Sequence, residues 1–330
     1  MDTRTVRLRA VEAASKLHRE LGLKNQIREG LRPIDVYDAI TRIGIPLLFR
    51  PLQGLLGAYL SAPAPGIMIS SADSLSPARQ RYTAAHELGH CYMGHESSID
   101  SEETLKRTAA SIATAPVYEA EAEVFASEFL MPKALVVKTA KRSGWGAKDV
   151  RDPRVVYQIS LRLGTSYSAT AYALRSHELI TSRDLDLLVN VRPKKIKEEL
   201  LTGEITLESY HSDVVVLSEQ DHGRLLILKP GDCVILNLAE HTSGGFQWRL
   251  REAYPNLDML RDNRTQEGEG LAFGQPTKRI FTFKGQDLIE LGLVEDRAWE
   301  SHVGSEFLLL ADFRGREEGL PRYLGGGFRD

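Results

Sequence analysis

The chain has 330 residues, with 42 Lys and Arg against 45 Asp and Glu, so its formal net charge at pH 7 is -3. This length allows two domains that each bury a core, and a nearly neutral charge does not indicate nucleic acid or an anionic membrane as partner. The apolar runs are too short to cross a bilayer, and the first residues predict a charged amphipathic helix, not a signal peptide. The two cysteines, Cys91 and Cys233, fall in different predicted domains, which favours a cytoplasmic protein without a disulfide framework.

The region before residue 71 predicts helices followed by a small sheet. A second helix begins at Pro33 and ends near Gly44. Short strands are expected at residues 45–49, 58–60 and 67–70, with a Pro- and Gly-rich turn at 62–66. If strand 67–70 forms the edge of the sheet, an extended peptide can pair with it.

The next predicted helix carries the sequence His86-Glu87-Leu88-Gly89-His90, behind an N-cap at Ser76 followed by Pro77. At roughly 100° per residue, His86 and His90 lie about 40° apart, so both imidazoles can bind one metal ion. Glu87 lies beside them, where it can accept a proton from a water held there. Catalytic zinc sites use three protein ligands and leave one position open, and helix, small sheet and metal helix follow in the order typical of zincin folds.

Two alternatives concern this helix. A surface helix with two stray histidines is disfavoured, because Ala84, Ala85, Leu88 and Gly89 predict a buried helix approached closely by others. His95 follows nine residues after His86, roughly 180° around a continuing helix, so it is not expected to be a ligand.

A third ligand is predicted in the helix over residues 118–132, where apolar side chains form one arc. Glu119 lies inside that arc, Glu123 at its edge and Glu121 on the opposite side. A carboxylate that points into a core is unfavourable unless it is paired or binds a metal. We therefore expect Glu119 to be the third ligand, with Glu123 as the reserve candidate and Glu121 in solvent.

Over about the first 180 residues the chain resembles the ImmA/IrrE metallopeptidases. The resemblance rests on residues 79–85 leading into the His86–His90 motif, on a Glu-x-x-Ala-x-x-Phe-Ala run that begins at Glu119, and on Leu-Met-Pro at 130–132. It implies Zn²⁺ held by His86, His90 and Glu119. The family usually has Asn where this chain has Glu123. It also implies a substrate, a helix-turn-helix transcriptional repressor that is cut once in response to stress or DNA damage.

The expected mechanism assigns Glu87 as the catalytic base, which takes the proton of the attacking water and passes it to the leaving amine. Four side chains are equal candidates for polarising the scissile carbonyl beside the metal: Tyr59, Tyr92, Tyr118 and His95.

Residues 152–181 resemble a helix-turn-helix, with helices at 155–163 and 168–174 around a turn at 164–166. The second helix has little positive charge to hold phosphates, so we expect structural packing and no direct DNA binding. The predicted peptidase domain therefore covers residues 1–181. A dense charge run begins at Arg192, and residues 182–212 are predicted to be a solvated helix or linker.

The remaining residues, 213–330, predict an all-β domain. Seven or so short β-type runs lie at 214–217, 225–228, 234–236, 246–250, 280–283, 288–293 and 307–310, which is typical of an antiparallel immunoglobulin-like sandwich. The expected fold class is thus α+β, with a zincin-like domain and its helical tail before the sandwich.

Residues 210–325 resemble chagasin-type inhibitors of cysteine proteases, in which three loops at one end of the sandwich plug a papain-like active site. The matching loops hold His241, Thr242, Ser243 and Gly244, then Gly274, then Arg297 and Trp299. Thr242 and Ala298 stand where the family has proline, which preorganises a loop, and this difference should weaken inhibition. Trp248 is expected in the core, whereas Trp299 is either core or an exposed anchor for a partner.

Three functions are compatible with these motifs. In the first, a zinc endopeptidase cleaves a repressor and the sandwich senses a signal or docks a protein partner. In the second, the chain is a cysteine-protease inhibitor or binding module with an appended peptidase. In the third, it is a DNA-binding regulator with a vestigial metal site, which the intact set of His86, Glu87, His90 and Glu119 argues against.

Overall fold

The computed structural model describes residues 3–101, 116–201, 207, 209, 211–266, 277–297, 299 and 303–322. The chain forms two compact units, each assembled from separate segments. The first unit comprises Met1–Thr139, Leu163–Leu185 and Arg316–Asp330, and the second comprises Ala140–Arg162 and Asp186–Gly315. The sequence predicts domains that are continuous in the chain, with boundaries at 181 and 213. The observed units are discontinuous: residues 140–162 belong to the second unit, and residues 316–330 belong to the first. Among the described residues, no helix combines the length and hydropathy needed to span a membrane.

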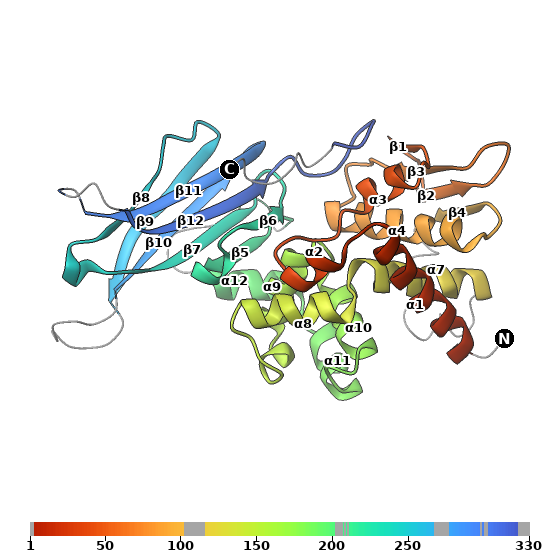
Figure 1. Cartoon of the computed structure of the whole chain (residues 1–330), viewed down its shortest axis with the longest axis horizontal. Helices are drawn as coiled ribbons and strands as arrows, with labels where there is room; N and C mark the ends of the chain where they lie inside the picture. The colour runs from red at the N-terminus through yellow and green to blue at the C-terminus, as the bar shows by residue number, and fades with distance from the viewer. Residues whose placement is uncertain are drawn as a thin grey trace. The chain divides into compact units, whose positions relative to one another are not determined.

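The first unit is built mainly from helices, and its small sheet lies along one side of them (Figure 1). Its elements are α1 (Thr3–Glu20), α2 (Lys24–Glu29), α3 (Val36–Arg42), β1 (Leu47–Arg50), β2 (Leu55–Leu60), β3 (Gly66–Ser70), α4 (Pro77–Met93), β4 (Ser98–Ser101), α7 (Val117–Leu130), α8 (Lys133–Arg142), α10 (Tyr167–Ser176) and α11 (Ser182–Val189). The last residues of α8 and of α11 belong to the second unit.

The four strands are ordered β1-β3-β2-β4. β3 pairs in parallel with β1 and antiparallel with β2, and β4 pairs antiparallel with β2. The condition for peptide pairing at strand 67–70, that it forms the sheet edge, is therefore not met, because β3 is hydrogen-bonded on both sides. The edges are β1 and β4.

Helix α4 lies between the sheet and α7, in contact with β2 and β3 on one side and α7 on another. The Ser76 side chain accepts a hydrogen bond from the Arg79 amide, which caps the predicted start of the helix, and Gly94 ends it with a left-handed φ of 74°. A Cβ atom at Gly89 would lie 3.1 Å from the Ala122 Cα. Glycine at this position thus lets α7 approach α4 closely.

A segment that follows the sandwich in the chain contributes to the first unit. Gly319 exchanges backbone hydrogen bonds with Phe49 at the free edge of β1, at 2.7 and 3.3 Å. The Gln80 side chain on α4 accepts from the Glu317 amide at 2.8 Å and donates to the Glu317 carbonyl at 3.0 Å and the Ser70 carbonyl at 2.9 Å. Residues 316–322 therefore join the sheet to the metal-motif helix.

The second unit contains the predicted sandwich (Figure 1). One sheet is ordered β5-β7-β10-β9 and the other β6-β12-β11-β8. The strands are β5 (Val214–Ser218), β6 (Arg224–Ile227), β7 (Cys233–Glu240), β8 (Gln247–Leu250), β9 (Leu257–Gln266), β10 (Thr277–Gly285), β11 (Leu288–Asp296) and β12 (Val303–Asp312).

Residues from both sheets share one core, which contains Phe281, Phe307 and, as predicted, Trp248. Most strand pairs are antiparallel, but β5 pairs in parallel with β7 and β6 in parallel with β12. The expectation of an antiparallel sandwich is wrong for these two pairs. Neither pair is consecutive in the chain, and β6, which lies between β5 and β7 in sequence, belongs to the other sheet, so the chain crosses between the sheets before β7 pairs with β5.

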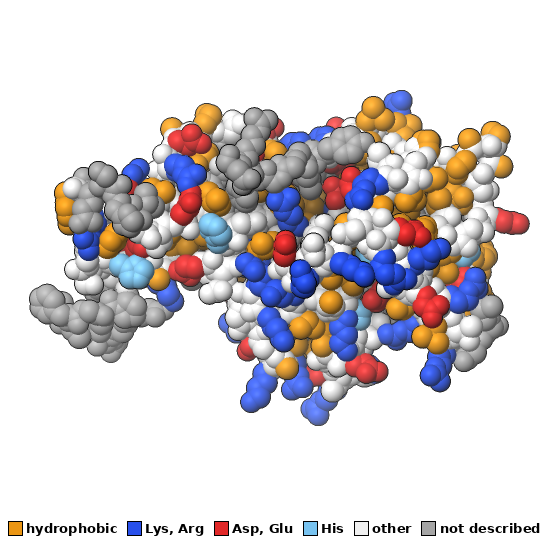
Figure 2. Space-filling view, in the orientation of Figure 1, with side chains coloured by type: hydrophobic (Ala, Val, Ile, Leu, Met, Phe, Trp, Pro, Cys, Tyr) orange, Lys and Arg blue, Asp and Glu red, His pale blue; other side chains and the backbone are white. Residues whose placement is uncertain are grey.

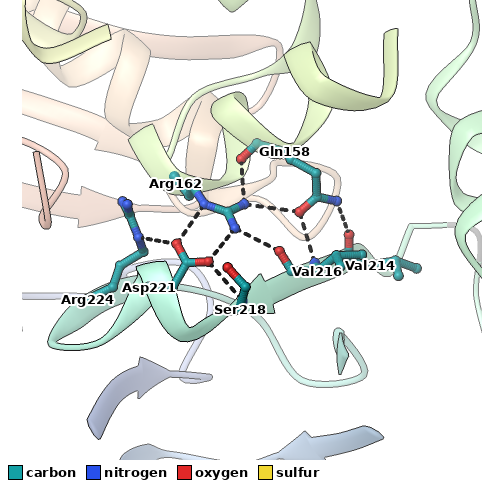
Figure 3. Close-up of polar contacts among 7 residues, drawn as sticks. All are labelled: Gln158, Arg162, Val214, Val216, Ser218, Asp221 and Arg224. Atoms are coloured by element: carbon teal, nitrogen blue, oxygen red, sulfur yellow. Dashed lines mark hydrogen bonds and ion pairs between the residues drawn. The ribbon is translucent and has the colours of Figure 1, made fainter. Parts of the chain in front are cut away.

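Helix α9 (Pro153–Leu163) docks on the sandwich through a buried polar network (Figure 3). Arg162 donates to Asp221 at 2.9 and 2.7 Å and to the Val216 carbonyl at 2.7 Å. Arg224 donates to Asp221 at 2.7 Å, and Gln158 bonds the backbone of β5. Burial alone would raise the pKa of Asp221, but attraction to the two guanidinium groups leaves that pKa below its usual value.

The helical segments predicted around residue 165 are confirmed as α9 and α10. The polar face of α9 that carries Gln158 and Arg162 is bonded to the sandwich. The charge run after Arg192 forms a helix, α12 (Pro193–Leu200). Its Lys197 is buried and 2.8 Å from Asp213, so this lysine is not part of a solvated linker.

Candidate metal centre

Three donor groups from two helices converge in the first unit. The Nε2 atoms of His86 and His90 lie 3.1 Å apart. Glu119 places its carboxylate oxygens 3.5 Å from the His86 Nε2 and 3.7 Å from the His90 Nε2. These ligand atoms all lie within 4.8 Å of one another. Donors of a tetrahedral zinc ion with bonds of about 2.0–2.1 Å are separated by roughly 3.3 Å, so the donor set fits such an ion.

Local sequence explains this convergence. His86 and His90 are one turn apart on α4, and both are buried. Glu119 lies in the first turn of α7, about one turn before Ala122, where the absent side chain of Gly89 allows the two helices to meet. The pKa of His90 is lowered to about 3, first by burial and then by repulsion from His86. His90 is therefore a neutral imidazole, the form that binds metal.

Glu87 is fully buried on α4 and faces the second strand of the sheet. A Cβ atom at Gly57 on β2 would lie 2.9 Å from the Glu87 Oε1 and 2.6 Å from the Thr83 side chain. Glycine at position 57 is thus required to accommodate the Glu87 carboxylate. The predicted base lies one residue from the first ligand, at a point where nothing larger than glycine fits opposite it.

Glu123 lies behind His86. Its Oε2 is 3.6 Å from the His86 Nδ1, and its Oε1 accepts a 2.7 Å hydrogen bond from the Tyr82 hydroxyl. Burial raises the pKa of Glu123, but His86 and Tyr82 together outweigh burial and lower it. Glu123, the reserve ligand, therefore meets the ring nitrogen of His86 that faces away from Glu119.

Glu121 is buried, with 2% of its surface exposed, so the expectation that it faces solvent is wrong. The apolar arc identified one covered face of α7, but α4 and α1 both pack against this helix. Glu121 binds Arg9 of α1 at 2.7 Å and the Nε2 of His95 at 3.0 Å. Sequence reasoning missed Arg9, for which the chain offers no local signal.

The candidates for a carbonyl-polarising group are separated by their surroundings. Tyr92 donates to Glu20 at 2.7 Å, Tyr59 is hydrogen-bonded to Cys91, and His95 is held between His90 and Glu121. Tyr118 is about half exposed, and its ring centroid lies 6.0 Å from that of His90. Of these four, Tyr118 is therefore the one that combines exposure with a place next to a ligand.

The predicted partner-binding residues lie in the second unit, where two of the three loops meet. His241 precedes the short helix Thr242–Gly244, which contains Ser243, and its amide and Nδ1 bond the buried Glu295 at 2.7 and 3.0 Å. The Arg297 guanidinium stacks 4.2 Å from the Phe246 ring centroid. Trp299 packs beside Gly245 and is 71% exposed, so it is not a core residue. Gly274 lies outside the described residues.

Comparison with protein families assigns the segment that carries the centre. Residues 40–175 match the family model described as the IrrE N-terminal-like domain, a family of metallopeptidases. This segment is similar to IrrE N-terminal-like domains. The match runs from within α3 through α10 and includes His86, Glu87, His90 and Glu119. It confirms the resemblance found in the sequence over these residues and supports a peptidase of this type. A comparison with curated proteins gave no match.

Two of the solved structures that match are distant from this chain. The cysteine protease inhibitor EhICP2 from Entamoeba histolytica matches with a TM-score of 0.29 and 18% identity, over 32% of this chain and 98% of the inhibitor. Amebosin matches with a TM-score of 0.24 and 16% identity, over 31% of this chain and 98% of its own. At these scores neither match supports an inference about binding.

Proposed function

We propose that this protein is a zinc-dependent, site-specific endopeptidase that cleaves a helix-turn-helix transcriptional repressor in a stress or DNA-damage response. The observation that carries the proposal is the convergence of two imidazole nitrogens and one carboxylate, with donor distances of 3.1–3.7 Å. Three protein ligands leave one position of a zinc ion for water, which is the arrangement of catalytic sites.

In this proposal, residues of the chain have separate roles in peptide cleavage. Bound zinc would supply a Lewis acid that activates water and polarises a carbonyl. Glu87 accepts the proton of the attacking water and passes it to the nitrogen of the leaving amine. Tyr118, exposed beside His90, donates a hydrogen bond to the carbonyl oxygen as negative charge develops there. Burial of Glu87 keeps bulk water from competing for that proton.

The sandwich would act as a sensing or docking module for a protein partner. An exposed tryptophan beside a stacked arginine is the composition of interface hot spots, and Trp299 and Arg297 provide it. A protease that cuts one regulator needs such control, because constant activity would destroy its target. Trp299→Ala should slow cleavage of the protein substrate and leave zinc binding unchanged. Equal cleavage rates would remove this role.

The first test is a comparison of protein N-termini in cells that express the wild type or Glu87→Gln, with and without DNA-damaging stress. New termini within a repressor, present only with the wild type, are expected. Stress dependence of those termini would identify the signal. If the two strains have identical termini under stress, the peptidase proposal is contradicted. A papain inhibition assay with the purified full chain tests the alternative that the protein is a cysteine-protease inhibitor.

A further inference from the structure

The carboxylate of Glu121 is buried, although it does not belong to the metal-binding donor set. Burying an ionised group is unfavourable unless it is paired and hydrogen-bonded. Its Oε1 lies 2.7 Å from the Arg9 guanidinium and its Oε2 lies 3.0 Å from the His95 Nε2. Arg9 belongs to α1, which presents exposed basic side chains (Figure 2): Arg4, Arg7, Arg9, Lys16 and Arg19.

His95 reaches this position because α4 ends at Met93. On a continuing helix His95 would point away from the metal ligands, as its spacing from His86 predicts. Gly94 adopts a left-handed conformation instead, and the His95 amide returns to the His90 carbonyl at 3.0 Å. This turn places the His95 Nδ1 3.0 Å from the His90 Nδ1. Loss of helical geometry is thus what brings the third histidine to the site.

The two contacts of His95 determine where its proton lies. The Glu121 carboxylate can only accept a hydrogen bond, so the His95 Nε2 must carry a proton and donate it. In a neutral ring the His95 Nδ1 is then an acceptor. The His90 Nδ1 must therefore be the donor of the 3.0 Å bond between the two rings. This leaves the His90 Nε2 unprotonated, and that is the nitrogen facing His86 and Glu119.

From this geometry we propose that Glu121 and His95 are positioning residues that fix the tautomer and ring orientation of His90 for metal binding. The proposal rests on the proposed zinc site. Histidine ligands of metals usually donate their second ring N–H to a carboxylate or carbonyl group. For His86, the carboxylate of Glu123 lies directly beside the second ring nitrogen. For His90, the ring of His95 lies between the second ring nitrogen and the carboxylate of Glu121.

Two variants separate this role from simple packing. His95→Phe keeps an aromatic ring in place but removes both hydrogen bonds, and Glu121→Gln keeps an acceptor oxygen but removes the charge. Glu20→Gln is the matched control, because Glu20 accepts a 2.7 Å bond from Tyr92 of α4, a residue outside the donor set. All three are measured in the full chain, with helical melting curves to check the fold.

The first readout is zinc affinity by chelator competition. Loss of a supporting partner typically weakens metal binding by about 10–100-fold, which is the expected effect of His95→Phe. Glu121→Gln should have a smaller effect in the same direction, and Glu20→Gln none. Equal zinc affinity for the wild type and a folded His95→Phe would overturn the proposal.

The second readout needs no metal. Nitrogen-15 NMR of the metal-free protein reports which ring nitrogen of His90 is protonated. The wild type should show the Nδ1–H form, and His95→Phe should shift His90 toward the Nε2–H form. An unchanged tautomer in His95→Phe would contradict the positioning role. A wild type without zinc affinity but with the expected tautomer would instead contradict the proposed function, so the two failures are distinguishable.

Discussion

Each unit contains a cluster of polar side chains, and these two clusters are arranged in opposite ways. In the second unit, the buried Asp221 lies between two guanidinium groups at 2.7–2.9 Å, and the half-buried Asp213 lies between two lysines at 2.7–2.8 Å. In the first unit, two imidazoles and one carboxylate, which can each bind a metal cation, converge on one point. Paired buried charges fix how elements pack, whereas convergent ligands indicate a site that an ion completes. The first arrangement is architectural, and the second is the candidate metal centre.

The largest expected effect separates chemistry from metal binding. Glu87→Gln should reduce the cleavage rate by about 100–10,000-fold, because a positioned general base contributes that much, while zinc stoichiometry stays unchanged. Cleavage and bound zinc are measured on the same preparation. Full activity in a zinc-loaded Glu87→Gln protein would remove Glu87 from the mechanism.

Breaking the architectural arrangement should affect the second unit alone. Asp221→Ala leaves two buried arginines without their carboxylate and should destabilise the second unit by about 3–5 kcal/mol. All three tryptophans, Trp145, Trp248 and Trp299, belong to that unit, so tryptophan emission reports its unfolding. Zinc affinity should not change. A matching loss of zinc affinity would show that the two arrangements are not independent.

A smaller change should disturb the metal centre through packing. Gly89→Ala places a methyl group 3.1 Å from the Ala122 Cα, so α7 must move away from α4. We expect a loss of about 1–3 kcal/mol in stability and weaker zinc binding, because Glu119 is carried on α7. Gly144→Ala is the control. Its added Cβ would meet no atom within 4 Å, but the left-handed φ of Gly144 strains any other residue. This variant should lose stability and keep its zinc affinity.

The smallest expected effect is on the pH dependence of stability. Acidification should lower the free energy of unfolding of the first unit before that of the second, by an amount on the order of 1 kcal/mol. Burial lowers the pKa of His18, so below about pH 6.5 the unfolded chain binds a proton that the folded unit does not, and stability falls. The pKa of Asp221 is also lowered, but its contribution is complete above about pH 4 and is lost only below that. Helical signal should therefore weaken before tryptophan emission changes. The reverse order would contradict this assignment.

The metal motif could be predicted because its geometry is local. His86 and His90 lie one turn apart on any helix, and Glu119 belongs to a short apolar pattern that the family shares. The two sheets of the sandwich were likewise indicated by the short β-type runs. Strand order was not, because β3 enters between β1 and β2, and nothing in the chain order reports that.

The supports of the metal ligands were missed for a different reason. Glu121 was assigned to solvent because a helical wheel shows one apolar arc, and it cannot show that a second helix, α1, covers the opposite face. Helical spacing predicts His95 on the side of α4 opposite His86 only if the helix continues past Gly94, and α4 ends at Met93. Both errors concern contacts set by tertiary packing and not by spacing along the chain.

The return of residues 316–322 to β1 and Gln80 has a consequence for synthesis. These residues follow the whole sandwich in the chain, so the ribosome must translate the sandwich before the peptidase unit can acquire its last sheet contact. Domains of many proteins fold in sequence order as they leave the ribosome. In this protein, the peptidase unit cannot complete its sheet contacts until the sandwich, which follows it in the chain, has been translated. A nascent chain that stalls within the sandwich would therefore display the metal ligands on a helix that still lacks its partner at Gln80.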